Sequence, residues 1–174
     1  MKLKSKWPVR RFFAFLGALY LFCAVTPLLF AGSGTAKSES GFRIYDTATE
    51  TVRTVNDLDF LCGALPCEMA ASAPDEALKA QIIAIHTLYD RKRRENAGKD
   101  YDFTCDSAEK SIYTVDTELT DEEQNRVRAL CLSVLDKEIY FENEPINACY
   151  FAISAGCSQP FENVWPEKSY PYLT

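Results

Sequence analysis

The sequence is short of three features that would indicate a function directly. None of its seven cysteines forms a Cys-x-x-Cys pair, so their spacing names no pairing, and small buried thiols are the simplest interpretation. There is no internal repeat, which excludes a repeat architecture. Basic residues are scarce after residue 11, where 14 of them face 25 acidic residues, a net charge of −11. Such an acidic body argues against nucleic acid as a partner, because phosphate contacts need a positive surface.

The N-terminus has the opposite character. Residues 1–11 carry five basic side chains and no acid, and residues 12–31 are uncharged and mostly apolar. About 20 apolar residues can span a bilayer, with the preceding basic residues in the cytoplasm. We therefore expect a membrane anchor within 1–31, a flexible linker over 32–40, and a body over 41–174 on the extracytoplasmic side of the cell membrane.

A signal peptide cleaved near Ala31 is the alternative interpretation of the same segment. The apolar run is long for a signal peptide, which favours the uncleaved, single-pass anchor. Both interpretations export the body to a compartment that permits disulfide bonds.

Hydrophobic patterning within the body predicts two β-hairpins. Apolar and polar residues alternate over 42–46 and again over 51–55, on either side of a turn. A second pair of strands is predicted over 138–141 and 146–151. A short helix over 58–65 follows the first hairpin.

Two longer helices are predicted between the hairpins. The first starts at Ser72, which forms a capping pair with Asp75, and stops near Gly98. The second starts at Thr120, where Glu123 completes a capping box. Their core-facing stripes are Leu78, Ile82, Ile85 and Tyr89 in the first helix, and Val127, Leu130, Cys131 and Val134 in the second. The order hairpin, helix, helix, hairpin indicates an α+β fold.

Glu68 is the residue whose surroundings point most directly to chemistry. It lies in an apolar run over 64–70, just before the main helix. Desolvation disfavours the charged form of a carboxyl group, so a glutamate in such a run can hold its proton near neutral pH and act as a general acid. A partly exposed residue at a helix entry is the alternative.

Several blocks of sequence add a resemblance to this chemical argument. In chain order they are Ile44–Thr49, Asp57–Gly63, Glu68–Met69, Glu76–Gln81, Glu144–Tyr150, Ser154–Ser158 and Glu162–Trp165 with Pro171–Leu173. The most specific block is Glu-Ala-Leu-Lys-Ala-Gln at 76–81. These blocks resemble, in the same order, motifs of the stage II sporulation protein D family (SpoIID/LytB), bacterial enzymes that cut peptidoglycan glycan strands.

The resemblance implies lytic transglycosylase chemistry without a cofactor. One acid/base residue protonates the glycosidic oxygen, and the sugar's own 6-hydroxyl closes a 1,6-anhydro ring, so no second carboxylate is needed as in other glycosidases. Glu68 matches the family's catalytic glutamate. The residues expected to contact substrate are Lys79, Gln81, His86, Tyr150, Ser154 and Ser158.

The sequence also departs from the family pattern. His86, the only histidine, stands where the family usually has an arginine. The segment Cys105–Lys110 resembles a metal-binding loop, but Glu109 and Lys110 replace its histidine and second cysteine, so we expect no metal. Family members commonly continue past the Pro-Tyr-Leu segment, and the domain is therefore expected to be truncated at its C-terminus.

Two functions remain open at this stage. The first is cleavage of peptidoglycan glycan strands during engulfment in sporulation, by an enzyme anchored in the membrane. The second is a non-catalytic module that binds glycan or serves as a scaffold. The partners expected are glycan strands, the membrane through the N-terminal helix, and other wall hydrolases or sporulation proteins.

Overall fold

The computed structural model of the chain describes residues 41–153 and 156–173. The expected anchor (1–31) and linker (32–40) lie outside the described residues. No helix within 41–153 and 156–173 is long and apolar enough to cross a membrane. The helices and small sheets of the described part form a mixed α+β fold, which confirms the fold class predicted from the order of elements.

The first hairpin forms as its alternating pattern predicts. Strands β1 (Phe42–Asp46) and β2 (Thr51–Val55) pair antiparallel, with Ile44 opposite Arg53. A third strand, β3 (Phe103–Cys105), pairs parallel to β1 and gives the order β2-β1-β3. The sequence pattern predicted no strand at 103–105, because a three-residue segment acquires its strand character only from a distant partner.

Helix α2 (Asp57–Glu68) is longer than the predicted helix over 58–65. The Asn56 side chain caps it by accepting a hydrogen bond from the backbone N–H of Asp59 at 2.9 Å. The helix continues through Pro66 and ends where Met69 adopts an extended conformation. Glu68 is thus the last helical residue and does not lie in a loop.

The two long helices carry the predicted core stripes. In α3 (Asp75–Glu95) and α4 (Asp121–Val134), all eight predicted core residues are buried. The capping box of Thr120 and Glu123 is also confirmed. The predicted cap at Ser72 is wrong: Pro74 precedes the first helical residue and no side chain caps α3. Pro74 has a non-helical ψ of 144°, so α3 begins at Asp75, two residues after the position that a cap at Ser72 would give.

The second hairpin is much shorter than predicted. Strands β4 (Tyr140–Phe141) and β5 (Glu144–Pro145) join through Glu142 and Asn143, both at positive φ, as a tight two-residue turn requires. The predicted strand over 146–151 is wrong, because this segment finds no partner strand among the described residues. A short helix, α5 (Phe161–Val164), follows.

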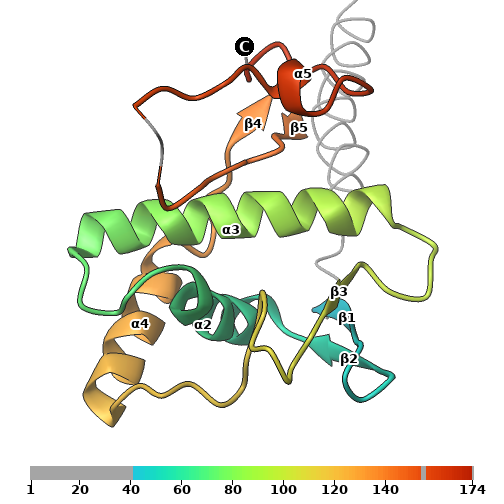
Figure 1. The fold of residues 1–174 in the computed structure, drawn as a ribbon. Helices are drawn as coiled ribbons and strands as arrows, with labels where there is room; N and C mark the ends of the chain where they lie inside the picture. Colours follow the sequence, from blue (N-terminus) through green and yellow to red (C-terminus); the bar gives the residue numbers. More distant parts are fainter. Residues whose placement is uncertain (1–40, 154–155, 174) are drawn as a thin grey trace, which may run out of the picture. The chain divides into compact units, whose positions relative to one another are not determined.

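Helix α3 lies between the two halves of the described fold (Figure 1). The sheet β1–β3, α2 and α4 lie on one side of α3, and β4, β5 and α5 lie on the other. On the side of β4, β5 and α5, the Arg91 guanidinium of α3 donates a hydrogen bond to the Pro145 carbonyl at 2.8 Å and lies over the Tyr170 ring. The C-terminal segment is further held by the Tyr172 hydroxyl, which accepts from the backbone N–H of Asn147 at 2.9 Å.

Asp46 ends β1 and attaches the loop before Ser111 to the sheet. Its buried carboxylate accepts hydrogen bonds from the backbone N–H groups of Ala48 (3.1 Å) and Ser107 (3.2 Å), and it pairs with Arg53 at 3.1 Å. Hydrogen bonds from Ser107 outweigh burial and lower the pKa of Asp46 from 3.8 to about 2.

This lowered pKa predicts a specific acid sensitivity. Since the carboxylate is favoured in the folded state, its stabilising effect is complete above about pH 4 and is lost as the pH falls toward 2. Between those values, urea denaturation should show a steeper loss of unfolding free energy for the wild-type chain than for Asp46→Asn. Parallel pH profiles for the two proteins would contradict this role.

Candidate functional site

Glu68 lies at the rim of the hydrophobic core. It continues the buried stripe of Leu61 and Leu65 by about one helical turn, but as the last residue of α2 it is exposed. The apolar neighbours in sequence therefore do not bury its carboxylate, in contrast to the desolvated environment expected from the sequence. The carboxylate is open to solvent, and to a substrate.

Two tyrosine hydroxyl groups are affected by the Glu68 carboxylate. Burial raises the pKa of Tyr150 well above its usual range, and Glu68 raises it further through its charge and a hydrogen bond with the Tyr150 side chain. Burial, with a contribution from the Glu68 charge, also raises the pKa of Tyr89. Both hydroxyls stay protonated at neutral pH, and that of Tyr150 can donate to the carboxylate.

Tyr150 comes from the segment after β5, whereas Tyr89 is on α3. The sequence predicted Tyr150 as a site residue through its motif, and the structure brings it to Glu68. Tyr89 was predicted only as a core residue, because its position in the α3 stripe carries that signal alone. It is 4% exposed and packs with Phe103 and Phe60, and only its hydroxyl end is affected by the charge of Glu68.

Cys67, the residue before Glu68, is influenced by both Glu68 and Lys110. The Cys67 thiol donates to the Gly63 carbonyl at 3.3 Å, and burial raises its pKa, with the Glu68 charge adding to the shift. The Lys110 ammonium opposes that shift and pairs with Glu118 at 2.9 Å. The Cys67 thiol therefore lies within reach of both the Glu68 carboxyl group and the Lys110 ammonium.

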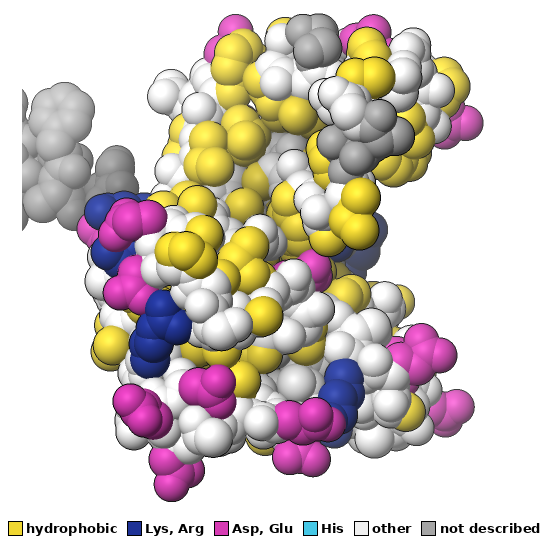
Figure 2. Space-filling view, turned by 60° about the vertical axis from the view of Figure 1, so that its left-hand side comes forward, with side chains coloured by type: hydrophobic (Ala, Val, Ile, Leu, Met, Phe, Trp, Pro, Cys, Tyr) yellow, Lys and Arg dark blue, Asp and Glu magenta, His cyan; other side chains and the backbone are white. Residues whose placement is uncertain are grey.

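The residues after Tyr150 and those around α5 expose several large apolar side chains. Phe151 is 65% and Ile153 is 88% exposed, and Val164 and Trp165 are more than half exposed. Figure 2 shows hydrophobic side chains gathered over the C-terminal part of the chain, with a hollow beneath them.

Lys79 and Gln81 are not brought to Glu68 by the contacts of the described residues. The Lys79 ammonium binds the Glu76 carboxylate at 2.7 Å, and Glu76 and Asp75 raise its pKa. Gln81 has a buried side-chain amide nitrogen without a hydrogen-bond partner in the described part of the chain. Lys79 lies ten residues before Tyr89, about 15 Å along α3.

His86 is buried at the opposite end of α2 from Glu68. Its Nε2 lies 3.8 Å from the Asp57 carboxylate and 3.7 Å from that of Glu138, and its ring packs edge-on against Phe42. Asp57 begins α2 and Glu68 ends it, about 16 Å apart along the helix axis. At 4% exposure, His86 contributes to the packing between α2 and α3.

The predicted serines give less information. Ser154 lies outside the described residues, and Ser158 is exposed on the C-terminal segment. For the altered metal loop, Cys105 is buried in β3, and no cluster of three or more histidine, cysteine or acidic side chains within 41–153 and 156–173 is arranged to hold a metal ion.

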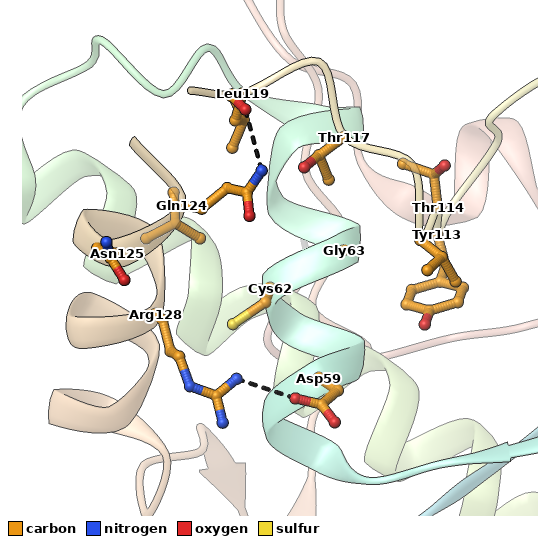
Figure 3. Close-up of a pocket in the computed structure, with 12 residues that line it drawn as sticks. Asp59, Cys62, Gly63, Tyr113, Thr114, Thr117, Leu119, Gln124, Asn125 and Arg128 are labelled. Carbon is orange, nitrogen blue, oxygen red and sulfur yellow. Dashed lines mark hydrogen bonds and ion pairs between the residues drawn. The ribbon is translucent and has the colours of Figure 1, made fainter. Parts of the chain in front are cut away.

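A cavity of about 350 Å³ lies elsewhere, between α2, α4 and the segment after Tyr113 (Figure 3). Its lining includes Cys62 and an ion pair between Asp59 and Arg128 at 3.0 Å. Glu68 does not line it. Residues from α4 and the preceding loop supply its other polar groups, among them Thr117, Gln124 and Asn125.

The structure thus brings an exposed glutamate, Glu68, close to a half-buried tyrosine, Tyr150, on a small α+β domain, and comparison with known proteins gives the family. The model of the Stage II sporulation protein (SpoIID) family matches residues 45–134, more than half of the chain. The chain belongs to this family. The match includes Glu68, whereas Tyr150 lies beyond it.

Two curated relatives are both named Stage II sporulation protein D. The protein from Bacillus subtilis (strain 168) is 26% identical over 153 residues, which cover 82% of this chain and 44% of the relative. The protein from Bacillus amyloliquefaciens is 26% identical over 140 residues, covering 75% of this chain and 40% of the relative. The chain thus spans less than half the length of the curated relatives it matches.

Proposed function

We propose that this chain cleaves the glycan strands of peptidoglycan as a lytic transglycosylase, with Glu68 as its general acid and base. One observation carries the proposal: the Glu68 carboxyl group is exposed at the end of α2 and close enough to the Tyr150 hydroxyl to raise its pKa through charge and hydrogen bonding. Family membership supports a role related to sporulation.

The proposed reaction needs one protein carboxyl group. Protonated Glu68 donates its proton to the glycosidic oxygen as the bond to the anomeric carbon breaks. The sugar's 6-hydroxyl attacks the same carbon and closes the 1,6-anhydro ring, while the Glu68 carboxylate accepts the hydroxyl proton. Tyr150 donates a hydrogen bond that orients the carboxylate and stabilises its charged form between the two proton transfers.

The cellular setting belongs to the same proposal. Residues 12–31 would anchor the chain in the cell membrane, with the domain on the extracytoplasmic side, where peptidoglycan lies. Other wall hydrolases or sporulation proteins are proposed partners. The acidic composition of the body argues against nucleic acid.

The test is incubation of the full chain with glycan strands from which the stem peptides have been removed. The proposal expects new chain ends carrying 1,6-anhydro sugars, detected by mass spectrometry. Hydrolytic ends without the anhydro ring would indicate a glycosidase of a different mechanism. Binding of the strands without new ends would contradict catalysis.

Tyr150→Phe tests the contact that carries the proposal. Loss of a hydrogen bond to a charged group costs about 1.5–3 kcal/mol, so kcat is expected to fall about 10- to 100-fold. Binding of the glycan, measured by co-sedimentation with insoluble strands, should change little. Tyr140→Phe is a matched control, since the Tyr140 hydroxyl contacts Glu138 and Arg94 and is not near Glu68; equal losses in both variants would exclude a specific role for Tyr150.

A second function is favoured by the position of His86. In this family the corresponding residue is usually an arginine suited to grip a sugar or carboxylate, whereas His86 is buried between α2 and α3. A domain without that group can still hold a glycan strand or a partner hydrolase without cutting. The incubation above separates this alternative from catalysis.

A further inference from the structure

Two cysteines from different helices, Cys62 and Cys131, lie close to one another, and Cys62 lines the cavity of Figure 3. The Asp59–Arg128 ion pair, at 3.0 Å, joins one face of α2 to one face of α4. Since residues three apart share a helix face, Cys62 lies on that face of α2 and Cys131 on that face of α4. Figure 3 shows the Cys62 sulfur pointing from α2 toward α4.

The two thiols differ in burial and access. Cys131 is fully buried in the core, whereas Cys62 is half-buried and lines the cavity. A reagent that enters the cavity of about 350 Å³ therefore reaches the Cys62 sulfur first.

The pKa values of the two thiols, like their access, favour Cys62 as the more reactive one. The Cys131 side chain forms a hydrogen bond with the Cys62 sulfur and, with help from the Arg128 charge, lowers the pKa of Cys62 despite burial. The same hydrogen bond and burial raise the pKa of Cys131. The thiolate is the nucleophile in thiol–disulfide exchange, so Cys62 attacks the oxidant in the first step and Cys131 attacks in the second.

We propose that Cys62 and Cys131 form a disulfide bond that joins α2 to α4 when the domain meets a disulfide oxidant. The oxidant is a dithiol oxidoreductase in its disulfide form or a small disulfide such as oxidised glutathione. This proposal stands independently of the glycan-cleaving activity.

The exchange proceeds in two balanced steps. The Cys62 thiolate attacks one sulfur of the oxidant; the oxidant's S–S bond breaks, a mixed disulfide forms on Cys62, and one oxidant thiolate leaves. With Cys62 no longer a thiolate, the main cause of the raised pKa of Cys131 is gone. Cys131 then loses its proton and attacks the Cys62 sulfur, which releases the second oxidant thiolate. The two protein sulfurs are oxidised, the oxidant is reduced to two thiols, and these take up the two protons.

The bond would fix the helix that ends in Glu68. It closes a long loop between positions 62 and 131, which restricts the unfolded chain and raises stability. It also links α2 to α4 independently of the surface ion pair between Asp59 and Arg128.

The experiment oxidises the reduced full chain with oxidised glutathione and blocks the remaining thiols by alkylation. Digestion without a reductant, followed by mass spectrometry, is expected to yield a cross-linked peptide pair containing Cys62 and Cys131. The oxidised chain should melt at a higher temperature, and dithiothreitol should reverse both changes.

Substitutions distinguish the thiol that attacks the oxidant from the thiol that resolves the mixed disulfide. In Cys131→Ala, glutathione should remain attached to Cys62; in Cys62→Ala, Cys131 should be recovered as a free thiol after unfolding and alkylation. Cys67→Ala, on the same helix, should leave the cross-link intact. A wild-type chain that keeps glutathione on Cys62, leaves Cys131 free, or pairs either residue with another cysteine would overturn the proposal, whether or not the variants fold.

Discussion

Glu68→Gln is expected to reduce release of 1,6-anhydro products by about 100-fold or more, since general acid–base catalysis typically contributes that much. Glutamine has nearly the shape of glutamate and keeps hydrogen-bonding atoms for Tyr150, but it can neither donate a proton to the glycosidic oxygen nor take one from the 6-hydroxyl. Because Glu68 is exposed at a helix end, the substitution should leave the fold intact.

The measurement is product release from peptide-free glycan strands, with strand binding and thermal melting recorded for the same samples. Glu122→Gln is a matched control, since Glu122 is an exposed glutamate at the start of α4. Unchanged product release by purified Glu68→Gln protein would remove Glu68 from the mechanism. Loss of release together with loss of binding would point to a role in holding the strand.

Phe60→Ala is expected to have the largest effect on stability. Phe60 is fully buried at the centre of an aromatic cluster, with ring centroids 4.6 Å from Phe42, 5.0 Å from Tyr89 and 5.4 Å from Phe103. Its removal leaves a cavity between α2, α3 and the sheet, which costs about 3–5 kcal/mol of unfolding free energy.

Urea denaturation with linear extrapolation measures this loss. Phe151→Ala removes the same ring from a side chain that is 65% exposed, so it should change the unfolding free energy by about 0.5 kcal/mol or less. Similar losses for the two variants would contradict the position of Phe60 at the centre of the core.

Local patterns predicted most of the elements below α3 in Figure 1. The first hairpin, the capping box at Thr120 and the buried stripes of α3 and α4 follow from side chains within one or two turns of one another. These contacts belong to a single segment, so periodicity and capping rules suffice for them.

The errors occur where distant segments meet. Strand β3 exists because Phe103–Cys105 pairs with β1, about 60 residues earlier in the chain. The segment 146–151 has strand-like residues but no partner strand in the described part of the chain, and so it stays irregular.

The same distinction between local motifs and distant contacts applies to the residues of the candidate site. Motif similarity identified Glu68 and Tyr150, and the structure places these two residues together. It does not bring Lys79 or His86 to them, because Lys79 pairs with Glu76 within α3 and His86 faces the start of α2. Which way a helix face turns depends on the partner that covers it, and one sequence does not carry that information.

The amino-acid sequence alone established the α+β class and the acidic body, and it predicted Glu68 as the acid/base residue, because each follows from composition, periodicity or a local motif. The exposure of Glu68, its contact with Tyr150, the burial of His86 and the approach of Cys62 to Cys131 arise only from the packing of α2 against α3, α4 and the segment after β5. Those contacts join residues about 30 to 80 positions apart, and their geometry is settled by how the helices cover a common core.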